Sequence, residues 1–282
     1  MMKFKIVADS CCDLDDNFKC LENIELIPLT LTVSGEDIVD DETFDQKRFL
    51  EKVSKATEEP KSSCPSPARY MESYEGDYDC VFVVTLSANL SGSYNSAEVG
   101  RTMYYEEHPG DKKKIHVFDS CSASVGETLL VMNILRLAEE GRAFEDIVEE
   151  VVKFRTGRST FFVIESLETL RKNGRLTGLT AVIASVLNIK PIMYGTTEGV
   201  IAKLDQARGM EKALLKLAQY IADNTGDAEE RILAISHVNC KQRAEWVRDE
   251  ILKRKKFKDV IIVDTAGVSS MYACDGGIIL SF

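Results

Sequence analysis

Short apolar segments alternate with helix-like segments through the first half of the chain, and this alternation is what most constrains the fold. Strands are indicated at residues 4–8, 24–31, 80–86 and 115–118. An amphipathic helix is indicated at residues 43–56, and further helices at residues 93–107, 124–140 and 144–154. Because alternating strands and helices favour a mostly parallel sheet covered on both faces, we predict an α/β fold for this half.

The second half has a different pattern, and we place a domain boundary near Thr156-Gly157. Strand candidates at residues 187–193 and 199–204 are joined by a turn-like segment, which indicates a hairpin and an antiparallel pairing. Helices are expected at residues 210–222 and 243–252, with strands at 160–164, 231–236 and 260–263. We therefore expect an N-terminal α/β domain at residues 1–157. A C-terminal α/β domain with a mixed or antiparallel sheet is expected at residues 158–282.

The charge balance limits the possible partners. The chain has 282 residues and a formal net charge of −11, so it has no general attraction for nucleic acids or anionic membrane surfaces. We expect no nucleic-acid partner and at most transient membrane contact. The start of the chain does not resemble a signal peptide and no apolar run reaches the roughly 18 residues of a spanning helix, so a cytoplasmic location is expected.

The eight cysteines show neither a disulfide framework nor paired zinc-type spacing. We expect reduced thiols, no metal and no cofactor. Glycine-rich phosphate loops, dinucleotide turns and nucleophile elbows are also missing from the sequence. Of the three histidines, only His237 follows an apolar strand, which is where sites gather in α/β proteins.

One segment combines a buried strand, a serine-rich turn and a helix start, at residues 86–94. A helix start presents free backbone N–H groups and the positive end of the helix dipole. Ser91 and Ser93 add hydroxyl groups, and Gly92 lets a ligand approach the backbone. The segment suits a phosphate or a carboxylate, although ordinary capping of the helix by Ser91 or Ser93 explains it equally well.

Several segments, taken in order, resemble the DegV family of bacterial fatty-acid-binding proteins. They are Ile6-Val7-Ala8-Asp9-Ser10, Ser62-Ser63-Cys64-Pro65-Ser66, Leu90-Ser91-Gly92-Ser93-Tyr94, Asp119-Ser120-Cys121-Ser122-Ala123-Ser124-Val125-Gly126, Leu170-Arg171-Lys172-Asn173-Gly174-Arg175-Leu176, Leu187-Asn188-Ile189-Lys190-Pro191-Ile192 and Ala207-Arg208-Gly209. The resemblance runs from about residue 3 to residue 282.

The resemblance implies two domains with a long-chain fatty acid bound between them. It also implies a carrier without chemistry of its own. Members of the family present the carboxylate of the bound acid to a separate ATP-dependent fatty acid kinase, which converts it to an acyl phosphate.

The family motifs fall on specific residues of this chain. The carboxylate-binding hydroxyls would be Ser62, with Ser63 next to it, and Ser91, with Gly92 as a backbone donor. Ser62 stands where many members have a threonine. Arg175 and Arg208 resemble the arginines that members turn toward the kinase or the phosphate.

The chain departs from the family pattern near its end. Many members have a His-Thr-Gly-Pro-Gly segment there, whereas this chain has Asp264-Thr265-Ala266-Gly267-Val268-Ser269-Ser270. A histidine contact to the head group is therefore not expected from this segment. Either His237 or the C-terminal loop itself would have to replace it.

The free energies of tail burial and head-group binding are consistent with a carrier of a long-chain acid. Burial of one methylene is worth about 0.8 kcal/mol, so a chain of about fifteen gains roughly 12 kcal/mol before ordering costs. A hydrogen bond to a charged head group adds only about 1.5–3 kcal/mol. The tail should dominate affinity, and the head group should set orientation.

Two other readings remain open: a serine-dependent acyl hydrolase that uses Ser91 or Ser93, and a binding protein for another amphiphilic anion. Candidates for tail-lining residues are Ile164, Leu167, Ile183, Ile189 and Ile192, each of which could equally be plain core. We expect a monomer, because no exposed apolar helix seam is evident.

Overall fold

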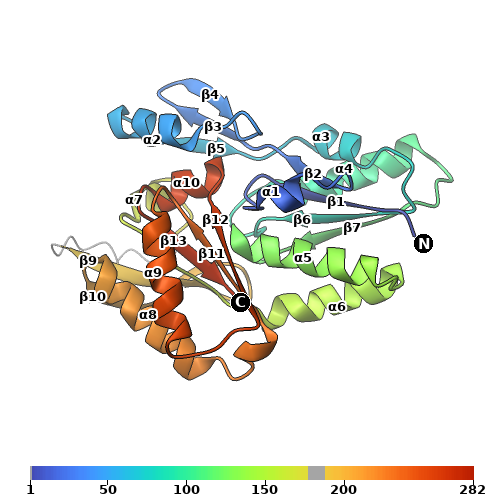
Figure 1. Cartoon of the computed structure of the whole chain (residues 1–282). Coiled ribbons are helices and arrows are strands. Elements are labelled where there is room, and N and C mark those ends of the chain that lie inside the picture. Colours follow the sequence, from blue (N-terminus) through green and yellow to red (C-terminus); the bar gives the residue numbers. More distant parts are fainter. Residues whose placement is uncertain (1, 177–187) are drawn as a thin grey trace.

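A computed structural model describes residues 2–176 and 188–282 of the chain (Figure 1). Its N-terminal half contains a four-stranded sheet with the order β2-β1-β6-β7, in which all neighbouring strands are parallel. The strands are β1 (Phe4–Asp9), β2 (Ile24–Ile27), β6 (Cys80–Thr85) and β7 (Lys114–Asp119). The prediction of a parallel sheet for this half is confirmed.

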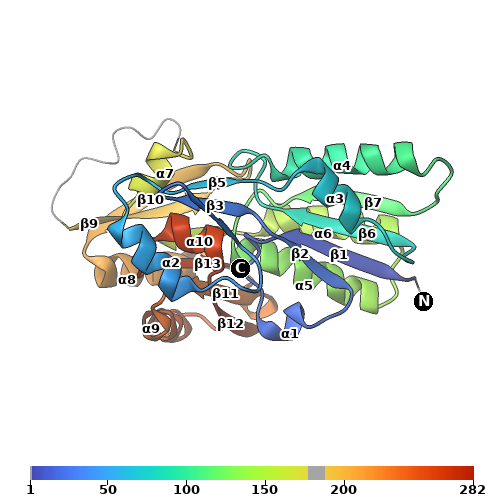
Figure 2. The same cartoon turned by 90° about the horizontal axis from the view of Figure 1, so that it is seen from above.

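Helices cover both faces of this sheet, as Figures 1 and 2 show. Val81 and Val83 of β6 pack toward one face, whereas Phe82 and Val84 pack toward the other. The first face is covered by α3 (Pro67–Ser73) and α4 (Ser93–Glu107), and the second by α5 (Val125–Glu139) and α6 (Phe144–Gly157). Burial on both faces explains why the 80–86 segment is apolar without alternation.

A small antiparallel sheet was not predicted. It has the order β4-β3-β5 and consists of β3 (Thr30–Val33), β4 (Glu36–Val39) and β5 (Lys61–Ser63). We expected one strand over residues 24–31, but the chain leaves the parallel sheet after Ile27. Pro28 has no N–H to donate, and the Leu29 N–H donates to Ser10 Oγ at 3.0 Å instead of to a strand. Nearby helices are α1 (Asp16–Lys19) and α2 (Gln46–Lys55).

The C-terminal half contains a mixed six-stranded sheet with the order β10-β9-β8-β13-β11-β12. Its strands are β8 (Thr160–Val163), β9 (Ile189–Gly195), β10 (Ile201–Arg208), β11 (Ile232–His237), β12 (Asp259–Asp264) and β13 (Ile278–Ser281). The β9–β10 hairpin is antiparallel, as predicted, and only β11 and β12 are parallel. Leu187, which we expected to open this hairpin, lies outside the described residues. Strand β13, near the end of the chain, was not predicted.

The two faces of the six-stranded sheet have different neighbours. Helices α8 (Met210–Asn224) and α9 (Lys241–Leu252) cover one face. The other face is turned toward α5, α7 (Glu168–Lys172) and α10 (Gly267–Ala273). A short 3-10 helix spans Ala228–Glu230. No helix within the described ranges combines the length and the apolar character that a membrane crossing requires.

Two buried aspartates join α10 to the N-terminal half. The Asp40 carboxylate accepts hydrogen bonds from the Gly267 and Val268 N–H groups, at 2.6 and 2.9 Å. The Asp13 carboxylate accepts from the Ala266 N–H at 2.6 Å. Burial raises the pKa of both carboxyls, that of Asp13 to about 7, so these contacts are made in a weakly solvated interior.

We expect Asp40→Ala to lower the free energy of unfolding by about 2–4 kcal/mol, because it leaves two buried N–H groups without an acceptor. Urea denaturation of the purified variant measures this loss. Asp223→Ala, at an exposed position of α8, is the matched control and should change the stability by no more than about 0.5 kcal/mol. Equal effects of the two variants would contradict the role assigned to Asp40.

Candidate functional site

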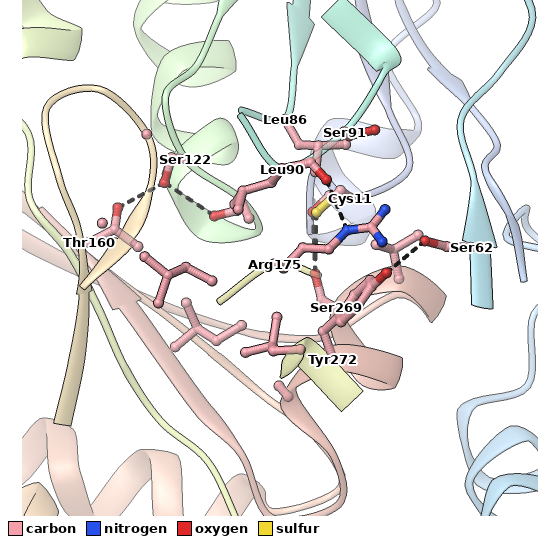
Figure 3. A pocket seen from close by; sticks show the side chains of 18 of the residues that line it. Cys11, Ser62, Leu86, Leu90, Ser91, Ser122, Thr160, Arg175, Ser269 and Tyr272 are labelled. Atoms are coloured by element: carbon pink, nitrogen blue, oxygen red, sulfur yellow. Dashed lines mark hydrogen bonds between the residues drawn. The ribbon is translucent and has the colours of Figure 1, made fainter. Parts of the chain in front are cut away.

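A cavity of about 310 Å³ lies between the two halves of the chain. One side is built by loops at the carboxyl ends of β1, β6 and β7, where sites of parallel sheets usually gather. The other side is the face of the six-stranded sheet that α8 and α9 leave uncovered. Figure 3 shows many of the side chains that line it. The lining is mostly apolar and includes Leu29, Leu86, Leu90, Phe162, Ile164, Leu170, Val200, Ile201, Val268 and Ile279.

Polar groups gather in one part of the wall. The Ser62 hydroxyl, on β5, lies 3.0 Å from the Tyr272 hydroxyl on α10. The Arg175 guanidinium lies over the Tyr272 ring at 5.7 Å, and its Nε donates to the Leu90 carbonyl at 3.1 Å. These contacts connect the small sheet, α10, the turn after α7 and the loop before α4. A half-buried cation therefore lies among hydroxyl groups at this end of the cavity (Figure 3).

Ser91 and Gly92 lie directly beside this polar end. Gly92 is the N-cap residue of α4 and supplies no capping side chain, while Ser91 Oγ accepts a hydrogen bond from the Ser93 N–H at 3.2 Å. No described group accepts from the Gly92 N–H. A side chain at Gly92 would place its Cβ only 3.0 Å from Cys64 Sγ, so the backbone here is closely packed against β5 and its loop. Ser91 therefore orders the turn before α4 without being its N-cap residue, and it also lines the cavity.

The loop between β9 and β10 closes another part of the wall. The Ser87 hydroxyl donates to the Gly199 carbonyl at 2.7 Å, and the Asn89 side chain donates to the Glu198 carbonyl at 2.6 Å. Gly199 has a φ of +77°, and a Cβ there would lie 2.8 Å from the Cys121 Cα. Only glycine fits both the backbone conformation and the space, so this contact between the halves depends on it.

A second polar group lines the wall at some distance from Ser62 in Figure 3. The Ser122 and Thr160 hydroxyls are 2.9 Å apart, and Thr160 also accepts from the Arg158 guanidinium at 2.8 Å. Arg158 is half-buried beside them. The two hydroxyls are hydrogen-bonded within the protein, so this part of the wall is polar but its groups already have partners.

The structure places Ser62, Ser63, Ser91, Gly92 and Arg175 in the wall of one cavity. Arg208 is not part of that wall, since it is exposed at the end of β10.

Of the tail-lining candidates, Ile164 lines the cavity, whereas Ile192 packs under α8 on the opposite face of the sheet. Leu167 and Ile189 do not reach the lining either. Ile183 lies outside the described residues.

Tyr272 is the contact that the sequence did not reveal. It lies in a helix of seven residues that we did not predict, two residues beyond the segment compared with the family pattern. The hydroxyl of Tyr272 lies beside that of Ser62 at the polar end of the cavity, and Val268 and Ser269 of the same helix also line the cavity. His237 is buried at the end of β11 and does not line the cavity.

The polar groups of the lining are chemically suited to an anionic oxygen. Hydroxyls, a backbone N–H and one guanidinium are all donors, and none of the three histidines lines the cavity. Burial raises the pKa of the Cys11 and Cys121 thiols, which are therefore protonated at neutral pH and are poor nucleophiles.

Comparison with known proteins gives a consistent result. A family model described as "Uncharacterised protein, DegV family" matches residues 3–281. A DegV domain-containing protein of Streptococcus pneumoniae is 33% identical over 286 residues, which cover 100% of this chain and 99% of that protein.

Solved structures of the same family superpose over the whole length of the chain. A DegV family protein from Ruminococcus gnavus, described with vaccenic acid, is 46% identical with a TM-score of 0.95, covering 100% and 99% of the two chains. The Streptococcus pneumoniae Fatty Acid Kinase (Fak) B3 protein, loaded with linoleic acid, is 31% identical with a TM-score of 0.89, again covering 100% and 99%. The chain belongs to the DegV family.

Proposed function

We propose that this chain binds one long-chain fatty acid in the cavity and presents its carboxylate to a separate ATP-dependent kinase for phosphorylation. The observation that carries the proposal is the convergence of Ser62, Ser91 and Arg175 at one end of a mostly apolar cavity. Relatives described with vaccenic and linoleic acid support the choice of ligand. The chain itself is a carrier and performs no catalysis.

The head group is held by donors from three separate elements. Ser62 comes from β5, Ser91 and the Gly92 N–H come from the start of α4, and Tyr272 comes from α10. A buried carboxylate is costly unless several donors meet it, and these groups supply them together with the charge of Arg175. The tail then lies against the apolar lining, including Phe162, Ile164 and Ile279.

Native mass spectrometry of the purified chain tests the proposal directly. We expect a co-purified C14–C18 acid at one per chain. With ATP and the kinase subunit, hydroxylamine should trap an acyl hydroxamate. Another adduct would redirect the assignment to a different amphiphile, and turnover of a chromogenic acyl ester by the chain alone would support a hydrolase instead.

We expect Ser91→Ala to weaken fatty-acid binding about 10- to 100-fold, because one hydrogen bond to the charged carboxylate is lost. Phosphorylation by the kinase should fall further, since the carboxylate loses orientation as well as affinity. Titration calorimetry and the hydroxamate assay measure the two effects. Ser54→Ala, at an exposed position on α2, is the control, and unchanged binding and turnover in Ser91→Ala would remove Ser91 from the site.

Filling the cavity should exclude the tail. Ala123 lines the cavity, and we expect Ala123→Phe to reduce affinity for C16–C18 acids at least about 100-fold while the chain remains folded. Ala68→Phe adds the same ring at an exposed position of α3 and should leave binding unchanged. A C18 acid bound with wild-type affinity by Ala123→Phe would show that the tail lies elsewhere.

Loss of Arg208 should affect phosphorylation by the kinase but not the affinity for the fatty acid. Arg208 is exposed and outside the cavity, so Arg208→Ala is expected to leave fatty-acid affinity unchanged and to lower kinase-dependent phosphorylation. Calorimetry and the hydroxamate assay, run on the same preparation, separate the two properties. Full phosphorylation of Arg208→Ala would remove Arg208 from the proposed kinase contact.

A further inference from the structure

Three buried side chains with metal-ligating atoms converge behind the wall of the cavity. Asp9 ends β1, Cys11 lies in the loop that follows, and Glu127 lies in the first turn of α5. One ligating atom of each lies within 4.8 Å of the others. The exposed fractions of these residues are 0%, 2% and 0%, so the group is isolated from bulk water.

Hydrogen bonding leaves much of this group unsatisfied. The two Asp9 oxygens each accept one backbone N–H, from Cys11 at 3.2 Å and from Leu86 at 2.9 Å, and each retains a free lone pair. Both oxygens of Glu127 are buried and have no partner among the described residues. Buried polar groups are normally paired, so two unpaired oxygens on one carboxyl require an explanation.

An independent observation comes from the opposite side of the group. The hydroxyl of Tyr70, on α3, is fully buried and also has no hydrogen-bond partner within the described ranges. Burial raises the pKa of Tyr70, and the charges of Asp9 and Glu127 raise it further. Tyr70 is therefore a further buried oxygen without a partner among the described residues, and it interacts electrostatically with two members of this group.

The buried carboxyl groups also favour a bound cation. Asp9, Asp13 and Glu127 are buried together, and within the described residues none of them forms an ion pair with a cationic side chain. Ionised carboxylates without a counterion are very costly in a protein interior, so Glu127 would ionise only if a cation met it there. A divalent cation between Asp9 and Glu127 would neutralise both and would also use the thiol, which is a weak hydrogen-bond partner but a strong metal ligand.

We propose that Asp9, Cys11 and Glu127 bind a zinc-type divalent cation in the interior, with the Tyr70 hydroxyl as a fourth donor. Two carboxylates and one thiolate suit a borderline-soft ion better than calcium or magnesium, which prefer oxygen ligands alone. Small side-chain rotations would bring the atoms to the roughly 2.0–2.3 Å of zinc coordination.

Metal binding at this site would displace protons from its ligands. Burial raises the pKa of both the Cys11 thiol and the Glu127 carboxyl, so both groups hold their protons more tightly than they would in water. Binding forms bonds from the metal to sulfur and to the carboxylate oxygens, and any proton that these groups carry is released to the buffer. Because Cys11 also lines the cavity, the ion reaches its ligands from the cavity.

Cobalt provides the test, because a cobalt–thiolate bond has its own charge-transfer absorption. The full chain is freed of bound lipid, incubated with Co²⁺ or Zn²⁺, desalted, and assayed by elemental mass spectrometry and absorption spectroscopy. We expect one equivalent per chain, a thiolate band with Co²⁺, and release of protons on Zn²⁺ binding, measured by calorimetry in buffers of different ionisation enthalpy.

Variants separate this site from the other thiols of the chain. Cys11→Ser should abolish the cobalt–thiolate band, and Glu127→Gln should weaken metal affinity at least about 100-fold. Cys20→Ser removes an exposed thiol and should change neither property. Glu127→Gln is expected to fold, because it replaces a buried acid by a neutral side chain of the same size. The proposal is overturned if the wild-type chain retains no metal, if the band persists in Cys11→Ser, or if Glu127→Gln binds as tightly as the wild type.

Discussion

The arrangement of the cavity depends on buried carboxylates that accept backbone N–H groups from the other half of the chain. Asp40 and Asp13 hold the start of α10, and through it they position Tyr272 opposite Ser62. Seven residues form a helix too short to be stable in isolation. Its place is fixed by these two anchors and by the burial of Val268 and Met271.

The polar and apolar parts of the cavity come from different architectural sources. Loops at the ends of parallel strands supply hydroxyls and backbone N–H groups, because chain reversals leave such groups unpaired. The sheet of the C-terminal half supplies a flat apolar face, since alternate residues of β8 and β13 point away from α8 and α9. A ligand with one charged end and a long apolar tail matches this division, and neither half alone offers both surfaces.

The local sequence pattern predicted the helices and strands whose side chains are buried either uniformly or with a regular period. β6 is buried on both faces and α4 begins at a serine–glycine turn, so both were expected near their observed positions. Sheet β4-β3-β5 was missed because its strands are short and one is separated from the others by α2. Strand β13 and α10 were missed because they are short and depend on partners that are distant in the sequence, such as Phe162 for β13 and Asp40 for α10. For the same reason, the serines of the cavity were anticipated from the resemblance, whereas Tyr272 was not.

The β9–β10 loop contacts Ser87 and Asn89, so the cavity is enclosed by segments that are far apart in the sequence. A bound tail would thus occupy the place of a core side chain, and it would stabilise the folded state in proportion to the logarithm of free ligand over its dissociation constant. The empty protein would be the less durable form and the first to be degraded. On this view, the cellular amount of the protein would follow the supply of its ligand without any dedicated regulator.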